Sequence, residues 1–280
     1  MSKAHMRKIQ EQYNDIFSKL EKTEDYGRFL EFLISQSEMT LGFTGAGVST
    51  ESGIPDYRSA GSLWEKNKFI PYDAFMKSEK NRVESWKRKF VMDDVFGLAQ
   101  PGIPHKAFAN CVQKKKMSAI ITQNIDGLHQ VSGVPDQNMI ELHGNATYAT
   151  CLSCSKRYEL NLIRQEFEKT QKAPVCEECG GIVKDAIISF GQAMPEQAMR
   201  RAQENTLACD LFIVAGSSLV VYPAAGFPLL AKENGATLVI LNRDPTELDR
   251  YADFVIHGEL GSILQPLVRS EFQIIEFSLE

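Results

Sequence analysis

Short apolar runs alternate with helix-length segments over most of this 280-residue chain. Runs of strand length recur along the sequence, separated in several places by helix-length segments such as 104–116, 195–206 and 223–234. The runs are 40–44, 119–122, 139–142, 186–190, 211–215, 237–241 and 254–256. Strands that alternate with helices in this way predict parallel βαβ units whose helices cover both faces of one sheet. We therefore expect an α/β fold with a doubly wound parallel sheet.

Two stretches interrupt this alternation. Residues 61–103 are polar, charged and helical in pattern, and residues 146–184 contain four cysteines and little apolar sequence of strand length. We expect both stretches to be insertions that together form a smaller domain, a helical module plus a metal ribbon. The large domain then comprises 39–60, 104–145 and 185–270, and 1–38 is an N-terminal helical extension that packs on the sheet. Ligands of such folds bind outside the carboxyl ends of the strands.

Four of the six cysteines form two Cys-x-x-Cys pairs, and the other two, Cys111 and Cys209, are typical of small buried hydrophobes. Two such pairs in one short segment favour a metal site over a disulfide framework. Four thiolates without a further ligand make a closed tetrahedral zinc site, which is structural. A redox dithiol is the alternative, but the pairs lack the βαβ position expected of one. The predicted ligands of one Zn²⁺ are Cys151, Cys154, Cys176 and Cys179.

The charge balance and the first residues exclude several classes of protein. With 31 Lys and Arg against 36 Asp and Glu, the net charge of −5 argues against direct nucleic-acid binding, and the basic run 87–89 is typical of a solvated helix face. Residues 1–22 mix both charge signs without an apolar core, unlike a secretory or mitochondrial targeting segment. Residues 211–231 carry no charge but contain glycines and prolines, which favour strand, loop and helix over a membrane span. We expect a cytoplasmic protein with no membrane contact.

The first apolar run ends in the turn Gly45-Ala46-Gly47, a feature of nucleotide-binding folds. Glycines at that position let a backbone approach a pyrophosphate closely and leave N–H groups to bind it. Thr50 replaces the third glycine of G-x-G-x-x-G, and no acidic residue follows at the spacing that nicotinamide dehydrogenases require. A nucleotide site is therefore plausible, a dehydrogenase is not, and a tight turn without ligand stays open. The next segment, 48–59, is a Gly-, Ser- and Pro-rich loop that can close over a cofactor.

Polar side chains follow two further apolar runs. Gln123, Asn124 and Asp126 come directly after one run, where side chains can bind a ligand amide or ribose. Simple helix capping is the alternative for Asn124 and Asp126. His143 ends another run, and a histidine with a pKa near neutrality can accept a proton from a hydroxyl. Taken alone, His143 is more typical of a structural residue.

Together these pieces resemble the sirtuins, the NAD-dependent protein deacylases, over about residues 38–265. The resemblance depends on six features that occur in the same order. They are Gly45-Ala46-Gly47-Val48-Ser49 through Gly53-Ile54-Pro55-Asp56-Tyr57-Arg58, Thr122-Gln123-Asn124-Ile125-Asp126, His143-Gly144, the four cysteines, Gly216-Ser217-Ser218-Leu219, and Asn242-Arg243.

The resemblance implies a Rossmann-type large domain, a small zinc domain, NAD as co-substrate and an acyl-lysine protein or peptide as partner. It implies His143 as general base and Asn124 as a second catalytic residue. The loop around nicotinamide and its ribose would comprise Gly45, Ala46, Gly47, Ser49, Glu51, Ile54, Asp56, Tyr57 and Arg58, with Gln123, Asn124, Ile125 and Asp126 completing that pocket. The wall for the adenosine half would comprise Gly216, Ser217, Ser218, Asn242, Arg243 and Leu260.

The family's reaction transfers the acyl group of a modified lysine to ADP-ribose and releases nicotinamide. In it, the general base takes a proton from a ribose hydroxyl after the acyl oxygen has attacked the ribose. Enclosure and alignment must supply much of the rate, because an amide oxygen is a poor nucleophile. A mono-ADP-ribosyltransferase on the same fold is the second hypothesis, and a non-catalytic zinc-ribbon adaptor is the third. The sequence leaves the oligomeric state and the protein substrate open.

Departures from the family pattern concern the acyl group. Sirtuins that prefer succinyl or malonyl groups carry a Tyr-x-x-Arg pair, and Trp86 and Lys89 stand near those positions here. A solvated helix with one buried ring is the simpler interpretation of that stretch. The pattern is closest to the branch that contains the mitochondrial lipoamidase and ADP-ribosyl-transferring sirtuins. The usual Lys-Pro after the last cysteine pair is Lys184-Asp185. We expect neutral acyl groups to be preferred over succinyl, because lysine lacks the bidentate fork of arginine.

Overall fold

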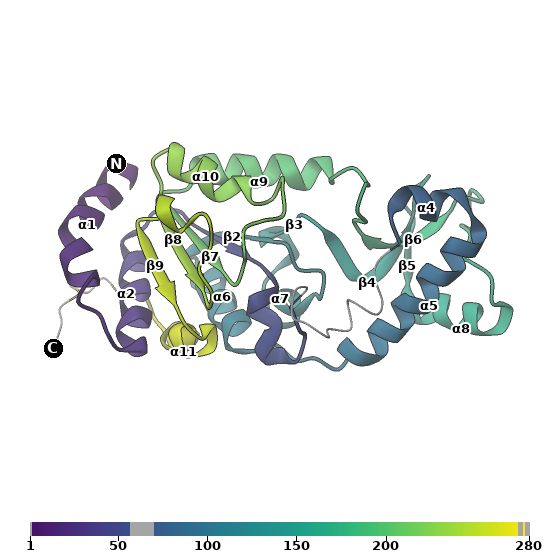
Figure 1. Cartoon of the computed structure of the whole chain (residues 1–280), viewed down its shortest axis with the longest axis horizontal. Coiled ribbons are helices and arrows are strands. Elements are labelled where there is room, and N and C mark those ends of the chain that lie inside the picture. Colours follow the sequence, from purple (N-terminus) through teal and green to yellow (C-terminus); the bar gives the residue numbers. More distant parts are fainter. Residues whose placement is uncertain (1, 57–69, 274–276, 278–280) are drawn as a thin grey trace.

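The computed structural model describes residues 2–56, 70–273 and 277. This part of the chain is elongated, with a large lobe around a parallel sheet and a smaller lobe at the other end (Figure 1). The strands of the large sheet are β1 (Thr40–Thr44), β2 (Met117–Thr122), β3 (Met139–Glu141), β7 (Leu211–Ala215), β8 (Thr237–Asn242) and β9 (Phe254–His257).

The large sheet is parallel throughout, in the order β3-β2-β1-β7-β8-β9. Counted along the chain within this sheet, that order is 3-2-1-4-5-6, the order of dinucleotide-binding folds. The predicted doubly wound, Rossmann-type fold is confirmed. The strand order reverses between β1 and β7, so the topological switch point lies at their carboxyl ends.

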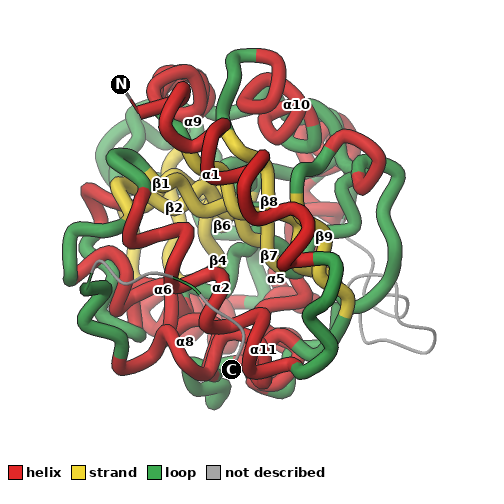
Figure 2. The backbone as a smooth tube through the Cα atoms, turned by 90° about the vertical axis from the view of Figure 1, so that its left-hand side faces the viewer, coloured by secondary structure: helices red, strands yellow, loops and turns green. Residues whose placement is uncertain are grey.

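Two helix layers cover the sheet (Figure 2). Along β7, Leu211 and Ile213 face one core cluster, whereas Phe212 and Val214 face the other. This alternation buries the strand on both faces, as a parallel sheet between helices requires. One layer contains α1 (Ser2–Phe17), α2 (Thr23–Gln36), α6 (Ile103–Gln113) and α11 (Leu260–Leu264), and the other contains α9 (Glu196–Ala208) and α10 (Gly226–Glu233).

The N-terminal extension packs on the sheet as expected. Met6, Ile9 and Tyr13 of α1 and Phe29 of α2 are buried in the same cluster as Phe254 of β9. Residues 211–231 form a strand, a loop and the start of α10, also as expected. No helix in the described ranges has both the length and the apolar character needed to cross a membrane.

The small lobe is built on a three-stranded antiparallel sheet in the order β5-β4-β6. Its core joins that sheet to two helices through Trp86, Phe90, Ile163 and Phe167. Its strands are β4 (Gly144–Cys151), β5 (Arg157–Glu159) and β6 (Val183–Ile187), and its helices are α4 (Tyr72–Lys77), α5 (Glu79–Phe96) and α8 (Leu160–Thr170). Short helical segments elsewhere are η1 (Ala46–Ser52), α7 (Leu128–Val131), η2 (Asp136–Asn138), η3 (Asp249–Tyr251) and η4 (Gln265–Arg269).

One predicted strand was assigned to the wrong sheet. The run 186–190 was expected in the main parallel sheet, but the strand found there, β6, pairs antiparallel with β4 of the small lobe. A short apolar run specifies a strand without specifying its partner, which depends on the rest of the fold. The small sheet thus extends past the expected borders at 145/146 and 184/185, while the domain boundaries themselves stay predictions.

Candidate active site

Glycines at the switch point allow two loops to cross in contact. Gly47 follows β1 and donates its N–H to the carbonyl of Gly216, which follows β7, at 2.8 Å. A Cβ on Gly47 would lie 2.7 Å from Cα of Gly216, and Gly216 itself has a φ of +63°. Side chains are therefore excluded from this crossing, and the backbone is left open to a ligand.

A cleft of about 1170 Å³ opens beside this crossing, lined by residues of both lobes. It brings together every predicted cofactor-binding or catalytic residue that lies in the described part of the chain. Tyr57 and Arg58 lie outside the described residues. The predicted residues that line the cleft are Gly45, Ala46, Gly47, Ser49, Glu51, Ile54, Asp56, Gln123, Asn124, Ile125, Asp126, His143, Gly216, Ser217, Ser218, Asn242, Arg243 and Leu260.

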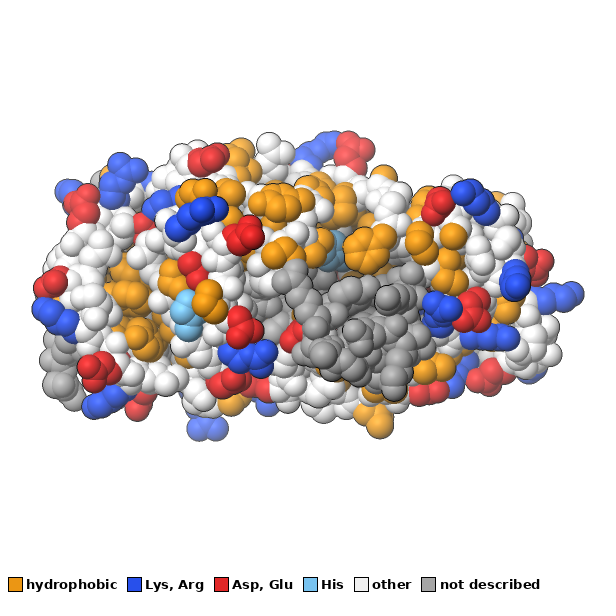
Figure 3. Space-filling view, viewed as in Figure 1, with side chains coloured by type: hydrophobic (Ala, Val, Ile, Leu, Met, Phe, Trp, Pro, Cys, Tyr) orange, Lys and Arg blue, Asp and Glu red, His pale blue; other side chains and the backbone are white. Residues whose placement is uncertain are grey.

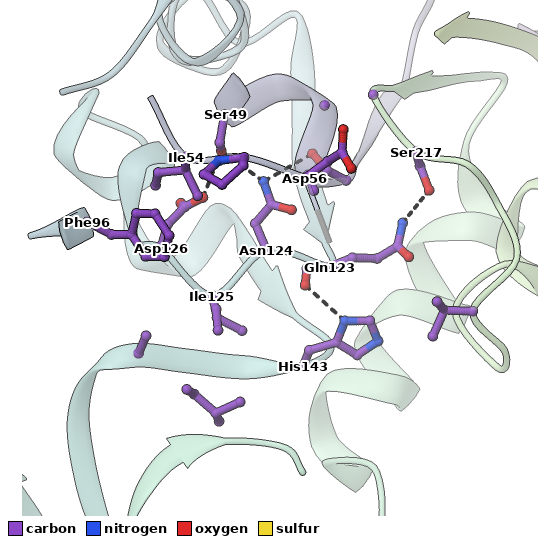
Figure 4. Close-up of a pocket in the computed structure, with 18 of the residues that line it drawn as sticks. Ser49, Ile54, Asp56, Phe96, Gln123, Asn124, Ile125, Asp126, His143 and Ser217 are labelled. Atoms are coloured by element: carbon purple, nitrogen blue, oxygen red, sulfur yellow. Dashed lines mark hydrogen bonds between the residues drawn. The ribbon is translucent and has the colours of Figure 1, made fainter. Parts of the chain in front are cut away.

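The hydroxyl of Ser49 bonds to the side chains of Asn124 and Asp126 at the floor of the cleft, and these three residues form a polar hub (Figure 4). It donates to Oδ2 of Asp126 at 2.7 Å and accepts from Nδ2 of Asn124 at 3.1 Å. The Asn124 amide also donates to the carbonyl of Gly45 at 3.1 Å, and Oδ1 of Asp126 accepts the N–H of Leu128 at 2.9 Å. Asp126 therefore caps α7, as the alternative interpretation proposed, and also faces the site.

A buried histidine in the first turn of α6, where the sequence favours a helix start over a binding role, supports this hub. The N–H of Gly102 donates to Nδ1 of His105, so the ring proton is on Nε2, which lies 3.2 Å from Oγ of Ser49. Burial lowers the pKa of His105, which keeps the ring neutral. His129 packs edge-on against it with ring centroids 5.0 Å apart, and burial lowers the pKa of His129 to about 3. His105 thus caps the first turn of α6 and also positions Ser49.

His143 has the geometry of a proton acceptor. Its Nδ1 lies 2.9 Å from the backbone carbonyl of Gln123, which can only accept, so Nδ1 carries the proton and Nε2 keeps a lone pair (Figure 4). Burial lowers the pKa of His143, and the bond to Gln123 opposes that shift in part. The neutral form therefore persists below the ordinary histidine pKa. The Gln123 side chain in turn donates to Oγ of Ser217 at 2.7 Å, which connects the segment beside His143 to the loop after β7.

Glu51 lines the cleft but also has a structural role. Its Oε1 accepts the first N–H of α6, at Ile103, which places a negative charge at the helix N-terminus. A Cβ on Gly102 or Gly261 would lie 2.3 Å or 2.2 Å from the Glu51 carboxylate. The carboxylate thus lies against the first turns of α6 and α11, and its contact with the Ile103 N–H accounts for its position without a ligand.

The four predicted zinc ligands converge in the small lobe. Their Sγ atoms all lie within 4.8 Å of one another. Sγ of Cys151 is 3.5 Å from that of Cys179, and Sγ of Cys154 is 3.6 Å from that of Cys176. Tetrahedral zinc with Zn–S bonds of about 2.3 Å places its sulfurs roughly 3.8 Å apart, so the set fits the ion. The hydroxyl of Tyr158 donates to Cys176 and lowers the pKa of that thiol to about 6, which favours the thiolate that binds metal.

A family model described as the Sir2 family matches residues 45–223, which contain the loop crossing, the Ser49 hub, His143 and the four cysteines. The chain belongs to the Sir2 family. An NAD-dependent protein deacetylase of Rhodopseudomonas palustris is 54% identical over 236 residues, covering 84% of this chain and 93% of that protein. NAD-dependent protein deacylase 2 of Archaeoglobus fulgidus is 37% identical over 246 residues, covering 88% and 96%.

Solved structures of Sir2 proteins share this fold. Sir2Tm bound to a propionylated peptide matches with a TM-score of 0.73 and 34% identity, covering 86% of this chain and 95% of that one. A Sir2 complex with a p53 peptide and NAD+ matches with a TM-score of 0.73 and 33% identity, with the same coverage. At these identities and coverages, the lobes described above are those of a Sir2 protein.

The small lobe of this Sir2 protein contributes a wall of the cleft that the sequence did not predict. Lys89, Asp93 and Phe96 of α5 line the cleft, whereas Trp86 is 2% exposed in the small-lobe core. The comparison of Trp86 with a cleft-facing tyrosine is therefore wrong, although Trp86 is the expected buried ring. The prediction that residues 87–89 form a solvated face is also wrong for Lys89, which is 5% exposed. The helix period brings Lys89 back to the inward side, and its ion pair with Asp93 offsets the burial.

Proposed function

We propose that this chain is an NAD-dependent protein-lysine deacylase that transfers the acyl group to ADP-ribose and releases nicotinamide. One observation carries the proposal. A neutral histidine with a free Nε2 lone pair and the Asn124–Ser49–Asp126 hub line one cleft at the switch point of a dinucleotide-binding sheet. The names of the relatives from Rhodopseudomonas palustris and Archaeoglobus fulgidus agree with it.

The residues of the cleft fit NAD. The bare backbone at Gly47 and Gly216 leaves room for a pyrophosphate, and Ser217 and Ser218 add hydroxyls beside it. Asn242 at the end of β8, Arg243 after it and Leu260 would hold the adenosine half. Gln123, Asn124, Ile125 and Asp126 surround the nicotinamide end. When bound, NAD supplies the electrophilic ribose carbon to which the acyl oxygen is transferred.

The chain's own residues orient the reactants and move a proton. The Nε2 of His143 accepts the proton of a ribose hydroxyl, because Nδ1 is already committed to the Gln123 carbonyl. The Asn124 amide is fixed from two sides, by the Gly45 carbonyl and the Ser49 hydroxyl, so that it presents one orientation to the ligand. Ile54 and Ile125 give the same part of the cleft apolar walls that exclude water.

An acyl-lysine in a protein or peptide is the second substrate. Apolar side chains gather where the two lobes meet (Figure 3), and four of those that line the cleft are exposed, Phe190, Val220, Val221 and Tyr222. Such a rim suits the apolar stem of a lysine and the backbone on either side of it. The Sir2 structure with a propionylated peptide supports this substrate class.

We also propose that the protein acts in the cytoplasm. The supporting observation is the group of four cysteine thiols in zinc-binding geometry, which requires reduced cysteines. Fractionation of the source cells with detection of the native chain tests this location.

The test of the activity is mass spectrometry of the products from acetyl-lysine peptide and NAD. The expected products are free lysine peptide, nicotinamide and acetyl-ADP-ribose in equal amounts. ADP-ribose attached to a protein, with the acetyl group left on the peptide, supports the ADP-ribosyltransferase instead. No turnover of any acyl-peptide by zinc-loaded protein refutes the proposal.

A further inference from the structure

The chain leaves β2 through a peptide group that two side chains hold. Strand β2 ends at Thr122, and the N–H of Gln123 still pairs with β1, donating to the Thr44 carbonyl at 2.9 Å. The next N–H, that of Asn124, donates to a side chain, Oγ1 of Thr122, at 3.1 Å. The carbonyl of the same peptide group, that of Gln123, lies 2.9 Å from Nδ1 of His143 (Figure 4). The 123–124 peptide group therefore connects the hydroxyl of Thr122 to the proposed base.

The orientation of this peptide group decides whether His143 can act as a base. A peptide group is planar, so its N–H and its C=O cannot turn independently. If the Asn124 N–H leaves Thr122, the plane is free to turn, and the Gln123 carbonyl turns away from His143. The hydrogen bond made by one ring nitrogen of a histidine determines which nitrogen carries the proton. Without the carbonyl at Nδ1, the proton can move to Nε2, which then has no lone pair to accept a proton from a hydroxyl.

The hydroxyl of Thr122 is itself held by two buried side chains. Thr44 lies directly opposite Thr122 in the register of β1 and β2, and its hydroxyl donates to Oγ1 of Thr122 at 2.9 Å. Nε2 of His129 lies 3.0 Å from the Thr44 hydroxyl. All three side chains belong to residues that are at most 2% exposed, so water does not compete for these bonds. A rotamer of Thr122 that turns Oγ1 away from Asn124 would therefore also break the bond to Thr44.

The direction of the hydrogen bonds follows from the other ring nitrogen of His129. Its Nδ1 is buried and has no hydrogen-bond partner among the described residues. An unpaired lone pair is tolerated in such a place more readily than an unpaired N–H, so the proton of His129 is on Nε2. His129 then donates to Thr44, and Thr44 donates to Thr122. Oγ1 of Thr122 thus accepts from Thr44 on one side and from the Asn124 N–H on the other.

We propose that Thr122 is a positioning residue, whose hydroxyl sets the plane of the 123–124 peptide group and, through it, the tautomer of His143. Thr44 and His129 keep that hydroxyl in place. This inference rests on the proposed deacylase function and deepens it. Thr122, Thr44 and His129 are absent from the residues that line the cleft, so each acts through the peptide group and not by contact with a substrate.

The first measurement is the tautomer of His143, obtained by nitrogen NMR of zinc-loaded protein with labelled histidine at neutral pH. The chain has five histidines, and the spectrum of His143→Ala assigns the signals of His143. Thr122→Val keeps the shape of the side chain and removes the hydroxyl, whereas Thr122→Ser keeps the hydroxyl. The matched control is Thr40→Val on β1, which removes a hydroxyl that is also buried but has no partner in the described part of the chain.

The parent should carry the proton of His143 on Nδ1, and Thr122→Val should show a mixture of the two tautomers. In Thr122→Val, kcat and kcat/KM for acetyl-lysine peptide should fall together by roughly ten- to a hundredfold, because the base loses both its tautomer and its direction while the substrate contacts remain. Thr122→Ser should restore the parent tautomer and most of the parent kcat. Thr40→Val should match the parent in both measurements.

A parent-like tautomer in Thr122→Val overturns the proposal, as does a parent that carries the proton on Nε2. Equal changes in Thr122→Val and Thr122→Ser also overturn it, because the hydroxyl would then not be the cause. Equal changes in Thr122→Val and Thr40→Val overturn it as well, because the loss of any buried hydroxyl would then have the same effect.

If Thr122→Val does not fold, Thr44→Val takes its place. This variant removes the donor that holds the Thr122 hydroxyl and should change the tautomer in the same direction, and a parent-like tautomer there overturns the proposal. Turnover of acetyl-lysine by the parent is measured separately. If the parent does not deacylate the peptide, the proposed function fails, whereas the tautomer measurement still decides this inference.

Discussion

Replacement of Ser49 by alanine should destabilise the floor of the site, because it removes a hydroxyl that three side chains contact. Ser49 is 1% exposed, and its hydroxyl bonds to Asp126, Asn124 and His105. In Ser49→Ala, Asn124 keeps the Gly45 carbonyl and Asp126 keeps the Leu128 N–H. The Nε2–H of His105 is left without a partner among the described residues, at 0% exposure. The consequences for the three partners therefore differ.

The magnitude follows from these contacts. An orphaned buried donor costs about 1–3 kcal/mol, and each of the two other lost bonds costs about 0.5–1.5 kcal/mol, so Ser49→Ala should lower the free energy of unfolding by about 2–6 kcal/mol. Asn124 loses one of the two contacts that orient it, so kcat/KM for acetyl-lysine should fall roughly ten- to a hundredfold. The control is Thr50→Ala, which removes an exposed hydroxyl bonded to the Gly47 carbonyl and should change stability by less than about 0.5 kcal/mol.

A double-variant cycle with His105→Phe decides whether the orphaned donor is the cause. Phenylalanine has no N–H to leave unpaired, so Ser49→Ala should cost about 1–2 kcal/mol less in the His105→Phe background than in the parent. The assay is urea unfolding followed by circular dichroism, with zinc present throughout. If the effects of the two substitutions on the free energy of unfolding add within about 0.3 kcal/mol, the hydrogen bond from His105 to Ser49 does not contribute as argued.

Three further expectations have simple measurements. His143→Ala should keep the fold and NAD binding but slow deacylation by about 10²–10⁴-fold, and turnover at the parent rate would show that His143 is not the base. The pKa of His129 is about 3 in the folded protein, below that of a histidine in the unfolded chain, so the free energy of unfolding should fall as pH drops below about 6.5. In His129→Phe, the free energy of unfolding measured in urea should depend less on pH, by up to about 1.4 kcal/mol per pH unit. Elemental analysis should find one zinc per chain, lost with loosening of the small lobe when serine replaces any of Cys151, Cys154, Cys176 and Cys179.

The sheet of the large lobe could be predicted because its strands are short apolar runs between segments of helix length. The run 211–215 is buried at every position in β7, and helix-length segments flank it. The run 186–190 gave a similar signal, yet its strand belongs to the small lobe. The two strands differ in their partners, because β6 pairs with β4 beside the cysteine ribbon, whereas β7 pairs with strands of the large sheet. That depends on contacts between distant segments, which periodicity does not contain.

The site, like the fold, contains residues that the sequence predicts and residues that it does not. Residues that directly follow strands, such as Asn124 and His143, could be found because parallel strands end at one edge of the sheet. Their roles, like those of the loop residues, stay predictions. The contact of His105 with Ser49 could not be predicted, because it joins residues 56 positions apart and a helix start explains His105 by itself. For the cleft-facing side of α5, the sequence shows only the spacing of Lys89 and Asp93, and their burial is known from the structure alone.

The departure at Thr50 from the dinucleotide fingerprint has a structural reason. In that fingerprint the third glycine lets a helix pack closely on the strand. Here Gly47 lies in a short 3₁₀ helix, η1, that ends at Ser52, and Thr50 is exposed on it with its hydroxyl bonded to the Gly47 carbonyl. No close contact excludes a side chain there. The close approach occurs instead between Gly47 and Gly216, where a Cβ would lie 2.7 Å from backbone. The close backbone approach that excludes a side chain lies at the crossing of the two loops and not between a helix and a strand. Glycine is therefore required at the crossing and not at position 50.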